Sequence, residues 1–298
     1  MNTKVASGSI ILAGILWGTM GLFVRGLSAD HFTSMEIVAL RVLGALLLVT
    51  VIILFYNRKL FEIRMRDCWC FAGTGIFSLT FFNLCYFQTI IMTSMSVAAI
   101  LLYTAPIIVV LLSAVLFKEK LNRKKIGAML LAFLGCVCVT GIIGGEGLTI
   151  SPTGILIGLG SGLGYALYSI FGRYAIERGY ESLTISFYTF LFASVGTIFL
   201  IPVRETASKL IHGDAGRNLL LVFGIALIAT VLPYILYTIG LSHVENGKAS
   251  IMASIEPVVA TLLGIFVFGE NLTAAGTVGM ILVLAAIMML NRCSSSLG

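Results

Sequence analysis

Residues 249–268 read ASIMASIEPVVATLLGIFVF, and this stretch is the most informative about the fold. It is apolar almost throughout and, at ~1.5 Å of rise per residue, is long enough as a helix to cross the hydrocarbon core of a bilayer. It nevertheless contains Glu256, a charge that costs at least ~2.5 kcal/mol at membrane depth. Pro257 follows directly and interrupts the helix, and backbone groups freed at this depth need protein or a watery cavity around them. The stretch therefore predicts a cavity near the midplane, as in secondary transporters.

The composition indicates an integral membrane protein. The 298-residue chain is 59% hydrophobic and only 11% charged, with a mean hydropathy of +1.07. Soluble domains carry roughly 25% charged residues, so this chain lacks the charge to cover a water-exposed surface. The net charge of +6 does not indicate a nucleic-acid partner, because in a membrane protein basic residues mark particular loops. The expected surroundings are a lipid bilayer, and a monomer is compatible with the sequence.

Apolar runs of similar length fill the rest of the chain and predict an all-α protein with ten transmembrane helices. A signal peptide is the alternative for the first run, but that run is long and lacks a small-residue cleavage site. We expect short loops, apart from a longer polar connection at 204–217. The ten expected spans are 9–27, 37–56, about 70–90, 97–117, about 126–143, about 154–174, 183–203, about 218–241, 249–268 and 274–290.

The basic residues predict the orientation in the membrane. If the N-terminus is cytoplasmic, the loops on the inner side hold most of the 19 Lys and Arg residues, including the run from Lys118 to Lys125. Cytoplasmic loops of membrane proteins carry an excess of these residues. We therefore expect a multi-pass protein of the plasma membrane with both termini in the cytoplasm.

The two halves of the chain resemble each other. Pro106 and Pro257 are 151 positions apart, as are Glu119 and Glu270, and residues 98–121 align with residues 249–272. We place the repeats at 1–147 and 148–298, with the boundary in the glycine-rich stretch at 144–147. Each half has five spans, so the second must enter the membrane upside down, a hallmark of secondary transporters. The alternative is a duplication retained for folding alone.

Several motifs now carry a family resemblance. L-W-G-T at 16–19, A-P-I-I-V-V-L-L at 105–112 with K-E-K-L at 118–121, and I-E-P-V-V-A-T-L-L-G at 255–264 with G-E-N-L at 269–272 resemble the drug/metabolite transporter superfamily, EamA type. The resemblance implies ten helices as two inverted five-helix repeats, a central cavity lined by helices 1, 3, 4, 6, 8 and 9, and usually export of metabolites or amino acids. One departure breaks the symmetry, because Ala105 stands where the second half has Glu256.

Two charged residues lie within the expected spans. Glu256 is the main candidate, either as a cavity carboxylate that exchanges protons or binds cations, or as a structural group bonded to neighbouring helices. Arg41 is either a counter-charge for an anionic solute or a structural residue that reaches the outer interface, and the second interpretation is favoured. Pro106 and Pro257 are the expected structural breaks. Lys248 and Glu245 flank the ninth span and are interpreted as loop charges.

Polar and aromatic residues within the spans predict the lining of the cavity. Interfacial aromatics would lie at span ends, whereas a mid-span Tyr needs a partner for its hydroxyl. With Asn83 and Gln88 these aromatics would form a weakly polar pocket for an amphipathic small-molecule solute. Helix packing is the alternative for part of the set. The candidates besides Glu256 are Trp17, Asn83, Tyr86, Tyr103, Tyr165, Tyr168, Tyr234 and Tyr237.

Enzyme, metal and cofactor motifs are not found in the sequence. The six cysteines match no ligand spacing, and Cys136 and Cys138 point to opposite faces of a helix. Without a P-loop, transport must use an ion or solute gradient. The sequence therefore favours a secondary exporter of a small organic solute, such as an amino acid or drug-like molecule, with proton coupling as one option. An uptake permease, a sensor, or a lipid scramblase or membrane enzyme are the alternatives.

Overall fold

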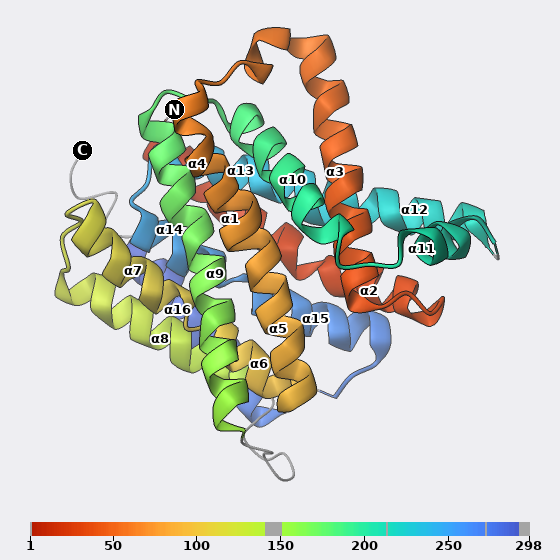
Figure 1. Cartoon of the computed structure of the whole chain (residues 1–298). Helices are drawn as coiled ribbons and strands as arrows, with labels where there is room; N and C mark the ends of the chain where they lie inside the picture. The colour runs from red at the N-terminus through yellow and green to blue at the C-terminus, as the bar shows by residue number, and fades with distance from the viewer. Residues whose placement is uncertain (1, 141–150, 213, 272, 292–298) are drawn as a thin grey trace.

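The computed structural model describes residues 2–140, 151–212, 214–271 and 273–291, and every regular element in this part of the chain is helical (Figure 1). The stretch at 144–147, the expected repeat boundary, Leu272 and Cys293 lie outside the described residues. The longer helices of the first half are α1 (Thr3–Gly18), α2 (Met20–Ala29), α3 (Ser34–Tyr56), α5 (Phe81–Met92), α6 (Met95–Leu102), α7 (Ala105–Leu116) and α8 (Arg123–Val139). Those of the second half are α9 (Pro152–Glu177), α10 (Ser182–Ile198), α11 (Val203–Ile211), α12 (Ala215–Ala226), α13 (Leu232–Leu241), α14 (Asn246–Ala253), α15 (Glu256–Phe268) and α16 (Ala274–Asn291).

Shorter helical pieces complete the chain between these helices. The 3₁₀ turns η1 (Arg58–Phe61) and η2 (Met65–Asp67) lead into α4 (Cys68–Ala72). The π-helical segments η3 (Gly73–Thr80) and η4 (Leu227–Val231) join α4 to α5 and α12 to α13 without a break in the helix.

Within the described residues, seven helical segments are long and apolar enough to cross a membrane, and an eighth is added if the bent pair α10–α11 counts as one span. This confirms the expectation of an all-helical multi-pass protein, but length and composition alone do not establish ten spans. Two further helices fall below the length required for a span. α8 has 17 residues and begins with three basic ones, and α16 is apolar over Ala274–Leu290. The seven segments are Thr3–Ala29, Ser34–Tyr56, Met65–Met92, Met95–Leu116, Pro152–Glu177, Ala215–Leu241 and Asn246–Phe268.

Two expected segments differ from the structure. The first span is not one helix over 9–27, because α1 ends at Gly18 and α2 begins at Met20; the hydroxyl of Thr19 donates to the carbonyl of Leu16 at 2.7 Å. The polar connection at 204–217 contains a helix, α11, bent by 106° from α10. The Lys209 ammonium on α11 binds the buried Glu36 carboxylate at 3.0 Å, which fastens α11 to the start of α3.

The helix breaks recur in both halves at the spacing read from the sequence. α6 and α14 each have eight residues, and each ends at a two-residue turn, Tyr103–Thr104 or Ser254–Ile255. α7 and α15 follow at once, with Pro106 and Pro257 in their first turns, where the missing N–H costs little. The prolines therefore begin new helices rather than bend existing ones.

Smaller features repeat at the same spacing. Lys118 and Gly269 both have a positive φ, of 55° and 68°, at the end of α7 and α15. Directly after them, the N–H of Glu119 donates to the carbonyl of Ser113 at 3.2 Å, and that of Glu270 to Gly264 at 3.1 Å. These paired details agree with a two-repeat fold.

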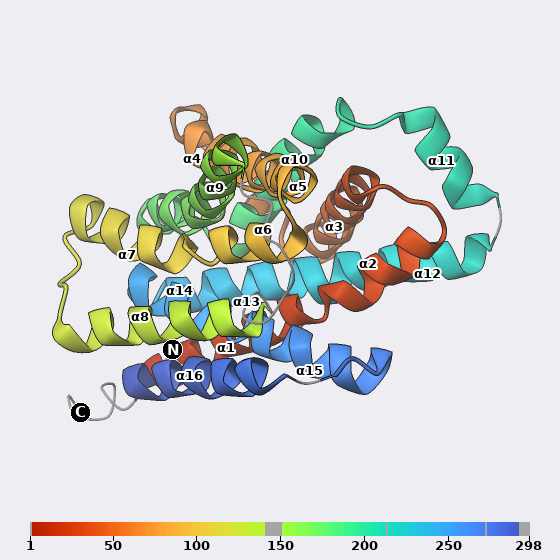
Figure 2. The same ribbon diagram turned by 90° about the horizontal axis from the view of Figure 1, so that it is seen from below.

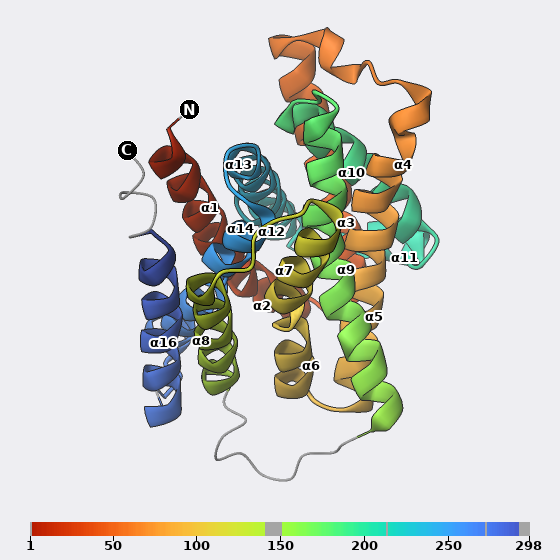
Figure 3. The same ribbon diagram turned by 90° about the vertical axis from the view of Figure 1, so that its left-hand side faces the viewer.

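The last helices of the two halves, α8 and α16, lie side by side (Figure 2). They cross where Gly135 meets Gly279, and a Cβ on Gly135 would lie 2.7 Å from the carbonyl oxygen of Gly279. Only glycine permits this approach. In Figure 3 the N-terminus and the α3–α4 connection lie at one end of the bundle, and the α5–α6 connection lies at the other.

We expect Gly135→Val to lower the free energy of unfolding by about 1–3 kcal/mol, because the added carbons meet backbone that moves only if the helices separate. Thermal unfolding in detergent measures the effect. Gly21→Val is the matched control, since a Cβ there has no neighbour within 4 Å. Equal stability of the two variants would contradict the close crossing of α8 and α16.

Candidate functional site

The first helix of each half crosses the broken helix of the other half at its break. A Cβ on Gly14 of α1 would lie 2.9 Å from the carbonyl oxygen of Ala253, and one on Gly18 would lie 2.8 Å from that of Glu256. On α9, a Cβ at Gly162 would lie 2.8 Å from the carbonyl oxygen of Leu101. These glycines therefore bring α1 and α9 directly onto the two breaks, whereas Gly21 has no neighbour within 4 Å of an added Cβ.

Glu256 lies in a small cavity between the halves. The cavity has a volume of about 20 Å³, which is room for about one ordered water. The Tyr165 hydroxyl on α9 donates to Oε2 of Glu256 at 3.3 Å. Glu256 thus faces α9 rather than lipid. The residues around the cavity are Leu102, Tyr103, Ala105, Pro106, Tyr165, Ser250, Ala253, Ser254 and Glu256.

An aromatic cluster centred on Trp17 adjoins this cavity. The Trp17 ring lies edge-on to Tyr165 and Tyr234, with centroids 6.4 Å and 5.5 Å away, and 5.4 Å from that of Tyr237. Tyr168 packs against Tyr234 at 4.9 Å. α1, α9 and α13 therefore contribute the rings, and five of the sequence candidates meet at one place.

The tyrosine hydroxyls fall into two groups. Those of Tyr168 and Tyr237 are bonded in the core, to Thr238 at 2.9 Å and Ser169 at 2.7 Å. Among the described residues, no hydrogen-bond partner is recorded for the phenols of Tyr86, Tyr103 and Tyr234, which all lie within range of the Glu256 charge. The first group stabilises the helix packing, whereas the second group has hydrogen-bonding capacity left over.

Arg41 is buried inside the protein. It does not reach the outer interface, contrary to the interpretation favoured from the sequence. Its side chain is 3% exposed, and Nη1 donates only to the Met20 sulfur at 3.6 Å. Nε has no partner among the described residues. The guanidinium lies within range of the Glu256 charge, although it forms no ion pair within 4 Å in the part of the chain that the structure describes. It is a buried cation beside the aromatic cluster, with hydrogen-bonding capacity to spare.

Other candidates lie elsewhere. Asn83 is buried on α5, and its side-chain amide donates to the carbonyl of Leu79 at 2.7 Å. The amide therefore bonds to the backbone one turn earlier in the same continuous helix. Gln88 is exposed. No group of three or more His, Cys, Asp or Glu side chains that could hold a metal ion occurs within the described part of the chain.

Two serines and one aromatic ring in this region were not predicted from the sequence. Ser250 and Ser254 line the cavity one helical turn apart, a spacing visible in the apolar stretch itself. Phe82 packs edge-on to Tyr165 at 5.7 Å, but nothing in its sequence context separates it from the other phenylalanines.

Comparisons with known proteins agree with this architecture. The EamA-like transporter family matches residues 6–141 and 152–292. An uncharacterized transporter of Archaeoglobus fulgidus is 29% identical over 96% of both chains. The uncharacterized transporter YxxF of Bacillus subtilis is 26% identical over 94% of this chain and 87% of its own. A crystal structure shares the fold with a TM-score of 0.80 and 18% identity, covering 99% of this chain and 98% of the other.

We expect Arg41→Met to leave the unfolding temperature unchanged or higher, because removing a buried cation without an ion pair saves several kcal/mol of desolvation. Arg178→Met is the control. It removes the partner of the buried Asp67, whose Oδ1 accepts from Nε at 3.1 Å, and should cost about 1–3 kcal/mol. A similar loss in both variants would show that Arg41 has a structural role instead.

Proposed function

We propose, because the chain belongs to the EamA-like transporter family, that it is a secondary transporter which moves a small organic solute by alternating access. The observation that carries this proposal is the carboxylate of Glu256, held in a cavity at the break of one half while Tyr165 and Tyr103 face it from other helices. Secondary transporters bind solute near the midplane, at interrupted helices where two repeats meet.

The proposed topology has ten transmembrane helices in two inverted five-helix repeats. In the first repeat they are α1–α2, α3, α4–η3–α5, α6–α7 and α8; in the second they are α9, α10, α12–η4–α13, α14–α15 and α16. The repeats would occupy 1–147 and 148–298. The excess of basic residues in loops at the end that holds the N-terminus supports a plasma-membrane protein with both termini in the cytoplasm.

The proposed solute is amphipathic, with an apolar body and at least one polar or charged group, as in an amino acid or a drug-like amine. The aromatic cluster around Trp17 offers large apolar faces, and a cation over such a face is attracted to it. Glu256 offers an acceptor, and Arg41 offers unused donors. Export is the proposed direction, driven by a solute or proton gradient.

In this mechanism Glu256 carries the coupling proton. A carboxylate in a cavity of low polarity either holds a proton or pairs with a cation, because an isolated charge there is costly. Proton and cationic solute would thus compete for one group, so inward movement of a proton would displace solute outward. Arg41, a positive charge near the site, would favour the ionised form of Glu256 and so help the proton to leave.

We expect Glu256→Gln to abolish proton movement linked to solute, because the amide cannot titrate. Purified protein is reconstituted into liposomes that contain a pH-sensitive dye, and a panel of amino acids and amphipathic amines is added outside. The wild type should give a solute-dependent change of internal pH. The variant should match empty liposomes while still exchanging labelled solute at equal concentrations.

Glu62→Gln provides the matched control, because it removes an exposed carboxylate from the loop before α4. It should behave as the wild type. Proton movement that survives Glu256→Gln would remove the coupling role, and no solute-dependent flux across the whole panel would count against transport itself.

A further inference from the structure

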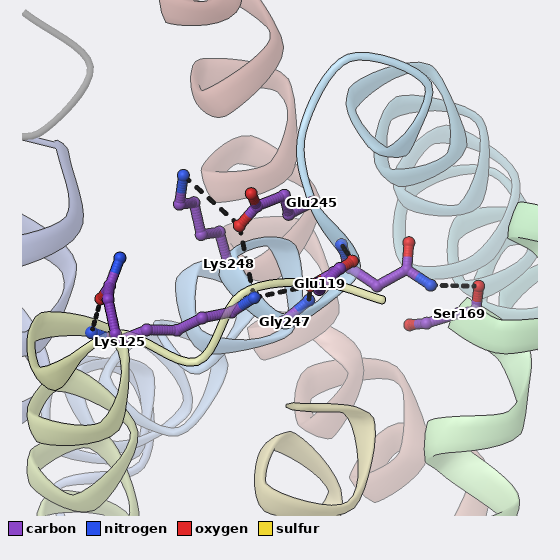
Figure 4. Close-up of polar contacts among 8 residues, drawn as sticks. Glu119, Lys125, Ser169, Glu245, Gly247 and Lys248 are labelled. Carbon is purple, nitrogen blue, oxygen red and sulfur yellow. Dashed lines mark hydrogen bonds and ion pairs between the residues drawn. The ribbon is translucent and has the colours of Figure 1, made fainter. Parts of the chain in front are cut away.

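A buried ion-pair network joins the two halves of the chain (Figure 4). It lies toward the end of the bundle that holds the N-terminus, where Ala6 of α1 shares a core cluster with Met129 of α8 and Val244. The Lys125 ammonium at the start of α8 lies 2.6 Å from Oε2 of Glu119 and 3.3 Å from Oε2 of Glu245. The Lys125 side chain is 1% exposed and that of Glu119 is 6% exposed. Glu245 also pairs with Lys248 at 3.4 Å, so these two residues are part of a network rather than simple loop charges.

The same network caps a helix of the other half. Oε1 of Glu119 accepts from the N–H of Asn246 at 2.7 Å, and Oε2 accepts from the N–H of Gly247 at 3.2 Å. These amides begin α14, and Glu245, at the N-cap position, makes no side-chain cap of its own. A carboxylate at a helix N-terminus satisfies free N–H groups and complements the helix dipole. The N-terminus of α14 is therefore capped by Glu119 of the first half and not by a side chain of its own loop.

Glycine and asparagine at the start of α14 fit this arrangement. A Cβ on Gly247 would lie 2.5 Å from Cε of Lys125, so glycine makes room for the lysine stem. The side-chain amide of Asn246 donates to the carbonyl of Ser169 on α9 at 3.2 Å. Three helices from both halves thus meet at one buried polar point.

The equivalent positions at the opposite end are built differently. At the spacing of 151, Glu245 corresponds to Ser94 and Lys125 to Gly276. Ser94 caps its own helix, α6, by accepting from the N–H of Val97 at 3.2 Å. Glu270, the counterpart of Glu119, pairs instead with Arg25, and both side chains are about half exposed. Only one end of the repeat pair therefore carries the network in its buried form.

α14 connects the network to the candidate site. It runs for eight residues from Asn246 to Ala253 and ends at the turn directly before Glu256. At ~1.5 Å per residue, the two points are about 12 Å apart along one short rigid helix. Movement of α14 away from Glu119 would open the cavity toward this end.

We propose that Glu119, Lys125 and Glu245 form a gate that closes the N-terminal end of the transport path, and that solute passes there only after Glu119 releases α14. The inference rests on the proposed transport function and adds the residues that control one of its steps. Buried charged groups hold this gate in one geometry, because separating them partway exposes unpaired charge. Among the described residues, the equivalent positions at the opposite end form no such buried network, so the two openings are controlled unequally.

The test measures the opening without a solute. The native cysteines of the full-length protein are replaced, and spin labels are attached at Arg123→Cys and His243→Cys, two exposed positions beside the network. Pulsed electron paramagnetic resonance in nanodiscs then measures the distance between the two labels. We expect Glu119→Gln to increase the population with the longer distance about tenfold, the effect of losing one charge-assisted bond. Gly247→Ala retains every charge but displaces Lys125, and should increase it in the same direction.

Glu270→Gln is the matched control, since it changes the equivalent carboxylate at the opposite end and should leave the distances unchanged. The proposal is overturned if neither Glu119→Gln nor Gly247→Ala increases the longer-distance population, or if Glu270→Gln increases it equally. Because no solute is needed, failure here is distinct from failure of transport: flux with unchanged distances removes the gate alone.

Discussion

The first helix of each half crosses closely over the broken helix of the other half, and the rest of the fold is arranged around these two crossings. Gly14 and Gly18 let α1 lie on the break at Ser254–Ile255, and Gly162 lets α9 lie on the break at Tyr103–Thr104. Unsatisfied backbone at membrane depth is tolerated only against protein or water. The crossings supply that cover, bring the Tyr165 hydroxyl to the carboxylate of Glu256 and place Trp17 beside Tyr165.

The broken symmetry between the halves gives the site its chemistry. Both halves supply a break, a proline and a glycine-bearing crossing helix, but only one supplies a carboxylate, because Ala105 stands opposite Glu256. The gate residues are unequal in the same way, since Lys125 has Gly276 as its counterpart. A duplicated scaffold thus provides the geometry, and the positions where its copies differ provide charge, which is where coupling and directionality are expected to lie.

Local patterns in the sequence predicted the repeat spacing, the breaks at Pro106 and Pro257 and most of the aromatic cluster, because each depends on residues close together or on one fixed offset. Features that depend on distant pairs were not predictable. Glu36 binds Lys209 across 173 positions, so the segment at 204–217 was not recognised as a docked helix. Arg41 looked like an interfacial residue because its burial is set by the helices packed around it, and not by its distance from the end of the span.

Alternating access at this site requires that water and solute reach the break beside Glu256 from both sides of the membrane, though not at the same time. The most direct test measures how fast the thiol of Ser254→Cys, in an otherwise cysteine-free protein, reacts with a membrane-impermeant maleimide. The reagent is applied to right-side-out vesicles and, separately, to inverted vesicles. The account predicts reaction from either side, and slower reaction from both sides when solute is bound. A thiol that reacts from neither side, or only with lipid-soluble reagents, would contradict it.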